Sequence, residues 1–399
     1  MMKKDTRNIT DLKQNNLRDI IRIVKIYPNI TKTAISKKIG MTSVSAHNFI
    51  SILIEKGLCV SSGKASSETS GRKAVQYRMN KNYGYIVGAE LSRTAIHFTA
   101  YDMANNLLAE LHKSCDIRDK TATLDKLYAG VEGLLSERVL IGRRHLCTGI
   151  TIPGRANREG CIVLLPDADI WSGCPLKALF EEHFGVTSYV ENDNNANILA
   201  SKWLGMINDE TNAVFLTVAE GVGIGIITSR ELFRGTHDKG TEIGHTIVNM
   251  DGRLCSCGNK GCLQAYVSDQ AIYTDISYLL ASKYSGFAEQ SPNIAQIAVY
   301  AKKNKCNDLY AAFYAASDYI TAALHNIIKI YDPSVIMINS NWLKILPDIF
   351  DNIKLRVYAS CGIKDSDNVK FILDFDRNIM DLAPSLMAFD NFISTLEIK

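Results

Sequence analysis

The feature that most constrains the fold of this chain is a histidine followed by three closely spaced cysteines. Cys255, Cys257 and Cys262 form a C-x-C-x4-C motif, and His245 stands ten positions before the first cysteine. One imidazole nitrogen and three thiolates are a usual ligand set for a closed, tetrahedral structural zinc site. The sequence therefore predicts that this segment folds back on itself around a zinc ion.

Two glycines inside the motif support this interpretation. Gly258 and Gly261 lie where a tight loop must turn without clashes between Cβ atoms. A chance gathering of core cysteines is the simplest alternative, but three thiols within eight residues make it the weaker interpretation. A disulfide is a second alternative. An odd-numbered cluster in a chain with the features of a cytosolic protein favours a metal ion.

Length and composition are typical of a globular protein that works in water. The chain has 399 residues, enough for two or three domains, with 46% hydrophobic and 22% charged residues. The lysines near the start are followed by no apolar segment, so we expect no signal peptide. No run of about 18 apolar residues occurs, so we expect a cytoplasmic protein without a membrane partner.

Charge divides the chain into two parts. Residues 1–81 hold 16 Lys or Arg against 5 Asp or Glu, whereas the remainder holds 29 against 37. Such a division is typical of a basic domain that binds a polyanion, joined to an acidic domain with a different function. We call these parts the basic head and the acidic body. A basic face without a function is the alternative. We place the domain boundary between residues 1–82 and 83–399.

Periodicity predicts that the basic head is a winged helix-turn-helix. An apolar stripe from Leu17 to Ile26 predicts a first helix that stops near Pro28. Thr31 and Thr42 are typical N-caps for two further helices, which Gly40 separates. Two short strands, 58–62 and 75–79, then flank a polar loop that resembles a wing.

This head predicts an interface with operator DNA, because the third helix of such a unit enters the major groove. A three-helix dimerisation module is the alternative. Polar side chains near the start of that helix can reach bases or phosphates, and basic side chains of the wing can reach phosphates or a minor groove. The residues predicted to contact DNA are Ser43, Ser45, His47, Asn48, Arg72 and Lys73.

The acidic body has the pattern of an α/β fold. Strands followed by helices recur twice, which predicts two similar lobes with a ligand-binding cleft. The expected strands are 85–91, 95–102, 146–152, 214–218, 223–228 and 335–338. The expected helices are 123–138, 175–184, 196–204 and 309–331.

These motifs resemble those of the ROK family (repressors, open reading frames and kinases), and in particular its xylose and N-acetylglucosamine repressor members. The resemblance covers residues 15–395. It rests on Gly71-Arg72, Ile152-Pro153-Gly154, Glu191-Asn192-Asp193, Glu242 to His245 and the cysteine cluster. It implies a two-lobed, actin-like body of the ribonuclease H-like type, related to sugar kinases. It also implies a regulator, most simply a repressor, of carbohydrate utilisation genes.

The resemblance implies a site for a monosaccharide or sugar phosphate, made by Asn192, Asp193, Glu242, His245 and Gln264. In kinase members of the family the matching aspartate is the general base. His245 would use one ring nitrogen for zinc and the other for a sugar hydroxyl. Gln264 departs from the glutamate usual in the family, which changes the hydroxyl pattern that this position can recognise. A helix-capping role is the alternative for the Asn-Asp pair.

The nucleotide side of the family pattern is eroded in this chain. Kinase members carry Asp-x-Gly-Gly-Thr where this chain has 90–94, Glu-Leu-Ser-Arg-Thr. Their second phosphate turn is Gly-Thr-Gly-x-Gly, where this chain has Ala-Glu-Gly-Val-Gly at 219–223. Their late Gly-Gly is replaced in this chain by Asn339-Ser340. Phosphates need closely approaching backbone amides, which glycines permit. The pattern therefore favours a sensor that is not an enzyme.

Two other functions remain open from the sequence. One is a sugar kinase that keeps Asp193 as its general base. The other is a regulator controlled by a protein partner instead of a sugar. Whether a sugar or a protein controls the regulator, we expect a homodimer or homotetramer, because one helix-turn-helix makes too few contacts for selective binding to DNA.

Overall fold

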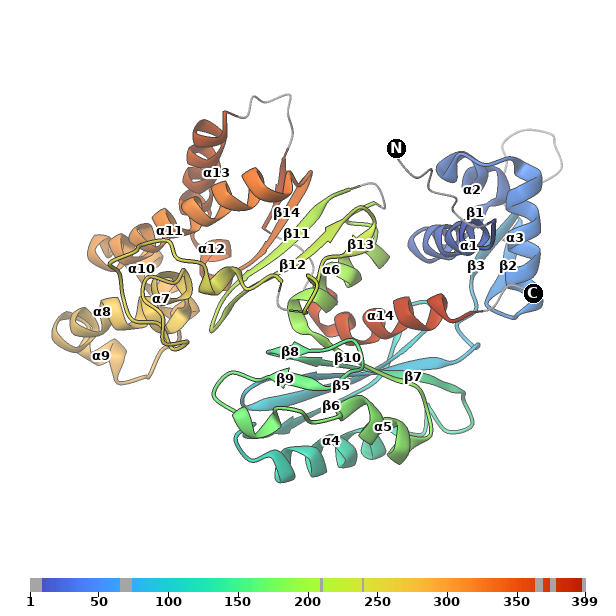
Figure 1. The fold of residues 1–399 in the computed structure, drawn as a ribbon, viewed down its shortest axis with the longest axis horizontal. Coiled ribbons are helices and arrows are strands. Elements are labelled where there is room, and N and C mark those ends of the chain that lie inside the picture. The colour runs from blue at the N-terminus through green and yellow to red at the C-terminus, as the bar shows by residue number, and fades with distance from the viewer. Residues whose placement is uncertain are drawn as a thin grey trace. The chain divides into compact units, whose positions relative to one another are not determined.

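The computed structural model describes residues 9–64, 74–208, 211–238, 240–362, 369–373 and 378–396. Two compact units make up the chain (Figure 1). Unit 1 comprises Met1–Met206 and Arg377–Lys399, and unit 2 comprises Ile207–Asp376. Within the described ranges, every helix is too short or too polar to cross a membrane.

The N-terminal part of unit 1 has the elements predicted for the basic head. It contains three helices and a small antiparallel sheet with strand order β1-β3-β2. The elements are α1 (Ile9–Ile26), β1 (Ile30–Thr31), α2 (Lys32–Ile39), α3 (Ser43–Glu55), β2 (Cys59–Lys64) and β3 (Val75–Met79). β1 was not expected from the sequence, and it adds a third strand beside the predicted pair.

The predicted capping residues delimit these helices. Thr31 and Thr42 are extended N-caps whose side chains accept hydrogen bonds from the backbone N–H groups of Ala34 and Ser45. Gly40 ends α2 in the left-handed region, with φ of 73°. The loop between β2 and β3, residues 65–73, lies outside the described residues, so the predicted wing is not described.

The rest of unit 1 is a lobe built on a five-stranded sheet with order β10-β7-β4-β5-β6. Its strands are β4 (Tyr85–Leu91), β5 (Ala95–Asp102), β6 (Leu107–Ser114), β7 (His145–Ile152) and β10 (Ser188–Asn192). The small pair β8 (Arg155–Ala156) and β9 (Ile162–Leu164) and the 3-10 turn η1 (Asp169–Trp171) lie between them in the chain. The helices are α4 (Lys120–Leu135), α5 (Leu176–Phe184), α6 (Asp193–Trp203) and α14 (Asn378–Ser394).

Unit 2 has a second five-stranded sheet, with order β13-β12-β11-β14-β15. Its strands are β11 (Ala213–Val218), β12 (Val222–Thr228), β13 (Glu231–Leu232), β14 (Val335–Asn339) and β15 (Lys370–Ile372). Its helices are α7 (Gln264–Val267), α8 (Asp269–Lys283), α9 (Ser285–Ala288), α10 (Ile294–Asn304), α11 (Asn307–Tyr331), α12 (Asn341–Ile345) and α13 (Pro347–Cys361). The 3-10 turn η2 (Ile243–His245) precedes α7.

The two sheets share one topology. In each, three successive strands pair antiparallel, and two later strands add in parallel beside the first of the three. The buried apolar residues form a separate core cluster around each sheet. The prediction of an α/β body made of two similar lobes is therefore confirmed.

α14 was not predicted, and it returns the end of the chain to unit 1. It packs on β4, β5 and β7 and against α6 (Figure 1). The sheet approaches it closely at Gly149, where an added Cβ atom would lie 1.9 Å from the carbonyl oxygen of Pro384. A side chain at this position would force the helix away from the sheet.

Candidate metal centre and candidate ligand-binding residues

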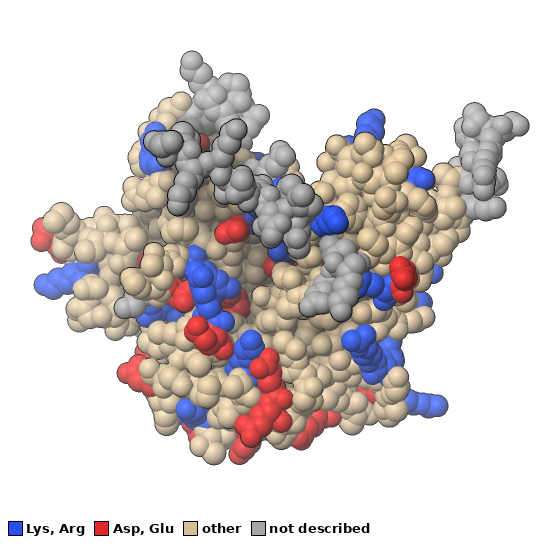
Figure 2. All heavy atoms as spheres, turned by 45° about the vertical axis from the view of Figure 1, so that its right-hand side comes forward, with Lys and Arg blue, Asp and Glu red and all other residues tan. Residues whose placement is uncertain are grey.

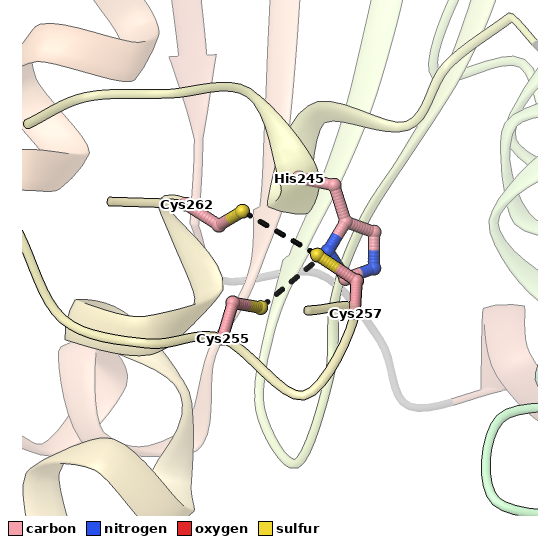
Figure 3. A group of neighbouring side chains, drawn as sticks. All are labelled: His245, Cys255, Cys257 and Cys262. Atoms are coloured by element: carbon pink, nitrogen blue, oxygen red, sulfur yellow. Dashed lines mark hydrogen bonds between the residues drawn. The ribbon is translucent and has the colours of Figure 1, made fainter. Parts of the chain in front are cut away.

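The predicted metal ligands come together in unit 2. His245, Cys255, Cys257 and Cys262 each offer one ligand atom, and these four atoms all lie within 4.8 Å of one another (Figure 3). The Sγ atoms of Cys257 and Cys262 are 3.6 Å apart, and His245 Nδ1 is 3.6 Å from Cys255 Sγ. All three cysteines are free thiols, so the disulfide alternative does not hold.

These separations fit a tetrahedral ion. With Zn–S bonds of about 2.3 Å and a Zn–N bond of about 2.0 Å, neighbouring ligand atoms lie about 3.5–3.8 Å apart. The two separations of 3.6 Å in this structure are within this range. The cluster can therefore hold a metal ion without rearrangement of the backbone, and such an ion would hold the thiols as thiolates.

The loop that presents the thiols is shaped by its glycines. Gly258 and Gly261 have φ of 88° and 75°, in the left-handed region that glycine adopts without strain. At Gly261 an added Cβ would lie 1.6 Å from the carbonyl oxygen of Asn249, so only glycine fits. The backbone N–H of Cys255 donates to the carbonyl of Asn259 at 2.8 Å, which closes the turn.

His245 is brought to the cluster by η2. Its backbone N–H donates to the carbonyl of Glu242 at 3.1 Å, which makes a short turn of the predicted Glu-x-Gly-His motif. Gly244 lets this turn approach β12, since a Cβ there would lie 2.2 Å from the carbonyl oxygen of Val222. The Nδ1 atom of His245 faces the thiols, and Nε2 points away from them (Figure 3).

Gln264 holds the glycine-containing turn of unit 2. Its Oε1 atom accepts a hydrogen bond from the backbone N–H of Val222 at 3.2 Å. An added Cβ at Gly221 would lie 4.0 Å from the same oxygen. Gln264 follows Cys262 by two residues, so the metal loop and this turn are joined through one side chain.

In unit 1, Asn192 is the N-cap of α6. Its Oδ1 accepts from the backbone N–H groups of Asn194 and Asn195 at 2.9 and 3.2 Å, and its Nδ2 donates to the carbonyl of Gly154 at 2.8 Å. Asn192 therefore has the helix-capping role, and its contact with a ligand stays a prediction. One N–H of its amide has no role in these three bonds.

Asp193 is the first residue of α6 and lies in a desolvated environment. Burial raises its pKa to about 6, while hydrogen bonds from Asn194 and Asn192 act in the opposite direction. Asn194 donates to its Oδ1 from both the backbone and the side chain, at 2.7 and 2.8 Å. Burial also raises the pKa of Glu90 to about 7, with further contributions from the like charges of Asp193 and Asp381.

The first eroded turn is a tight connection between β4 and β5. The backbone N–H and the side chain of Ser92 both bond to Ala95, which leaves Arg93 and Thr94 at the tip. Arg93 Nη1 lies 2.8 Å from Asp167 Oδ2, and both side chains are exposed. Arg93 is thus paired with a carboxylate of its own unit.

The second eroded turn carries two carboxylates. Asp269, at the start of α8, donates its backbone N–H to the carbonyl of Ala219 at 2.8 Å. Burial and the neighbouring charge of Glu220 raise the pKa of Asp269 to about 6. The late Gly-Gly position is Asn339-Ser340 at the end of β14, and Ser340 is buried. A turn with two acids beside it disfavours an anionic ligand.

The residues predicted to contact DNA on α3 are accessible in part. Ser43, His47 and Asn48 are exposed, whereas Ser45 is half-buried and bonded to the Thr42 cap. Arg72 and Lys73 lie outside the described residues. In Figure 2 the visible face of the head, at the upper right, is mostly uncharged, and its charged side chains are mainly Lys and Arg, whereas acidic side chains gather on the lower edge of the unit 1 lobe.

Val44 was missed by the sequence analysis. It is 70% exposed at the second position of α3, between the predicted polar contacts. A solvent-exposed apolar side chain near the start of α3 can contact a thymine methyl group in the major groove. Its position outside the apolar stripe of the helix was the signal that could have identified it.

The folds of both units and the Cys-His cluster define a two-lobed α/β protein of the actin-like, sugar-kinase-like class. The model of the ROK family matches residues 86–345, and the chain belongs to this family. A solved structure titled as a ROK family transcriptional regulator, homologous to the Escherichia coli MLC protein, has a TM-score of 0.78. The two sequences are 20% identical, and the match covers 96% of this chain and 97% of that one. The ROK hexokinase of Thermus thermophilus has a TM-score of 0.62 at 23% identity, with coverage of 77% of this chain and 98% of that one.

Two curated relatives extend the comparison. The xylose repressor of Caldicellulosiruptor bescii is 28% identical over 338 residues, which are 84% of each chain. The DNA-binding transcriptional dual regulator NagC of Escherichia coli is 27% identical over 278 residues, or 69% of this chain and 68% of that one.

Proposed function

We propose that this protein is a sugar-responsive, DNA-binding transcriptional regulator, most simply a repressor, of carbohydrate utilisation genes. The observation that carries the proposal is its similarity to proteins named as sugar repressors, over 84% of both chains in one case. Because the match to the Caldicellulosiruptor bescii repressor covers 84% of this chain, more than residues 83–399 can supply, it includes part of the basic head. The excess of Lys and Arg in residues 1–81 supports a nucleic-acid partner independently.

In this proposal residues 1–82 are a winged helix-turn-helix domain, and residues 83–399 are the sensing domain. α3 would enter the major groove with Ser43, Ser45, His47 and Asn48 toward the bases, and Arg72 and Lys73 would contact the backbone or a minor groove. A homodimer or homotetramer would bind a palindromic operator with half-sites about 10 bp, or a multiple of that, apart.

The metal in this proposal is zinc, held by His245, Cys255, Cys257 and Cys262. Three thiolates and one imidazole in a tetrahedral arrangement are typical of structural zinc, and the separations of the ligand atoms support it. Zinc would stiffen the segment from η2 to α7 and fix the ring of His245.

The proposed sugar contacts are Asn192 and Asp193 in unit 1 and Glu242, His245 and Gln264 in unit 2. Asp193 can accept hydrogen bonds from hydroxyls, and the Nε2 atom of His245 points away from the thiols. The effector would be a monosaccharide or a sugar phosphate.

We further propose that the protein does not transfer phosphate from ATP. The turn at 219–223 lies beside two carboxylates, and Arg93 is paired with Asp167. Both features oppose the binding of a nucleoside triphosphate, because its phosphates need free backbone amides and positive charge around them.

Selection of genomic DNA fragments with the purified protein tests DNA binding, and the selected fragments should share a palindrome. A thermal-shift screen of aldoses and amino sugars then tests sensing. Each sugar that raises the melting temperature should weaken binding to the selected operator. The Asp193→Asn variant should lose this response, whereas the exposed Asp351→Asn variant should keep it. If no sugar raises the melting temperature while operator binding is intact, a protein effector is favoured.

A sugar kinase is the second candidate, because Asp193 is kept and its pKa is raised toward neutrality, as suits a general base. ATP-dependent phosphorylation of the sugars that bind is the test. Turnover by the wild type that Asp193→Asn abolishes would refute the proposal that the protein is a sensor only.

A further inference from the structure

A second group of metal-binding side chains lies in unit 1, on one face of the sheet at its β6 edge. His97 of β5 is directly opposite His112 of β6 in the antiparallel ladder, and Glu110 is two residues before His112. Since side chains alternate along a strand, all three project from the same face. Their ligand atoms all lie within 4.8 Å of one another.

The two imidazole rings are stacked, and because an imidazole binds a metal in its ring plane, the exposed ring of His112 must turn about its side-chain torsions to share an ion with His97. The centroids of His97 and His112 are 4.0 Å apart, with an angle of 5° between the ring planes. His97 Nε2 lies 3.7 Å from Glu110 Oε2, too far for a hydrogen bond. This nitrogen is buried without a hydrogen-bond partner. A bound cation would supply the missing partner.

The other nitrogen of His97 faces a carboxylate on a different element. Nδ1 lies 3.6 Å from Asp381 Oδ1, in the first turn of α14. A histidine that binds a metal through one nitrogen usually presents the other to a carboxylate, which sets its tautomer and orientation. At 3.6 Å Asp381 makes no hydrogen bond to His97, but it lies on the side of the ring where an outer carboxylate would stand, and Nε2 is left to face Glu110 and His112.

We propose that His97, Glu110 and His112 bind one divalent transition-metal ion, with Zn²⁺ as the ion to test, and that Asp381 is a positioning residue for His97. Two imidazoles and one carboxylate suit zinc and its neighbours in the first row, and they leave a coordination position open to water or to an anion. His112 and Glu110 are exposed, so an ion can enter from solvent.

This site is independent of the Cys-His cluster. It lies in unit 1 and contains no sulfur, whereas the cluster lies in unit 2 and contains three thiols. It also does not depend on the proposed regulatory function, because its argument uses only the ligand atoms and their surroundings.

Equilibrium dialysis of the full-length protein against Zn²⁺, followed by elemental analysis, tests the site. We expect the wild type to bind one equivalent more than His112→Asn and one more than Glu110→Gln. Because the Cys-His cluster is present in every variant, its metal cancels from the difference. Asp381→Asn should keep the stoichiometry and weaken the affinity of this equivalent about 10- to 100-fold.

The matched control is His183→Asn, which alters another histidine beside a carboxylate, 2.8 Å from Glu132. It should bind as much zinc as the wild type. Melting temperatures with and without added Zn²⁺ separate binding from misfolding: the wild type should gain stability, and a folded His112→Asn should gain less. Equal zinc content in the wild type, His112→Asn and Glu110→Gln would overturn the proposal.

Discussion

Arg18 Nη2 lies 2.7 Å from Asp390 Oδ1, and the indole N–H of Trp203 donates to the same oxygen at 2.9 Å. This one carboxylate joins α1 of the basic head to α14 and to α6. Two further bonds run from the side chain of Gln14 to the carbonyls of Ile393 and Leu396. Asp381, near the other end of α14, adds its charge to that of Asp193 beside Glu90. α14 thus runs from the region of Asp193 to the helix that begins the head.

The first prediction concerns this junction. Asp390→Ala should lower the free energy of unfolding of unit 1 by about 1–3 kcal/mol, because it leaves the buried indole N–H of Trp203 and the partly buried guanidinium of Arg18 without an acceptor. Urea denaturation followed by tryptophan fluorescence measures the loss.

Asp351→Ala is the control for this prediction. Its partner Lys354 lies 2.7 Å away on the surface of α13, where such pairs contribute about 0.2–1 kcal/mol. Equal effects of the two substitutions would show that the α1–α14 junction adds no more than a surface ion pair.

The elements that were predicted from the sequence are those whose signals are local. The helices of the head were predicted because Thr31, Gly40 and Thr42 lie at their ends, and such capping residues act on the adjacent helix whatever the rest of the chain does. The metal cluster was predicted because its ligands lie close together in the chain. α14 was missed because Pro384 interrupts its pattern, and its register on the sheet depends on a glycine more than 200 residues earlier.

The candidate sites were predicted only in part for the same reason. Asn192 was named as a ligand contact, yet its position before α6 makes it a cap first. The group of His97, Glu110 and His112 was not identified, because it exists only when β5 and β6 pair in one register. A slip of one residue would place His112 on the other face of the sheet.

The second prediction concerns α3. Val44→Ala and Asn48→Ala should each weaken binding to the selected operator by about 1–3 kcal/mol and change binding to unrelated DNA much less, because both side chains are exposed toward the proposed groove and carry no charge. Fluorescence anisotropy with both DNAs at one salt concentration measures this. Val299→Ala, at a half-exposed valine of α10, is the control and should bind both DNAs as the wild type does.

The third prediction concerns the pH dependence of stability through Asp193. Its folded-state pKa of about 6 lies above the ordinary value of 3.8, so the folded state holds the proton over a pH range in which the unfolded state has lost it. Stability must then fall as the pH rises through the interval from about 4 to about 6. Asp193→Asn should remove the contribution of this residue to the fall, whereas Glu90 and Asp269 keep theirs, because an amide keeps the acceptor for Asn194 without the buried charge.

Relative to the wild type, we expect Asp193→Asn to be about 1–3 kcal/mol more stable at pH 8 and to differ little at pH 4. Urea midpoints across this range, with Asp351→Asn as an exposed control, measure the difference. A constant gap between variant and wild type at every pH would contradict the assignment of this step to Asp193.

The last prediction concerns the Cys-His cluster. Cys262 is fully buried, and its Sγ lies 3.6 Å from that of Cys257, so a serine there removes one of the four ligands without added bulk. Cys262→Ser should lose one equivalent of zinc, and a chelator should lower its melting temperature less than that of the wild type, because only the proposed site in unit 1 is left to lose an ion. The wild-type melting temperature should fall, because an ion that binds only the folded state stabilises it. Cys161→Ser, at a half-buried free thiol in unit 1, should keep the metal and the chelator response. Equal zinc content in both variants would rule out the cluster as the metal site.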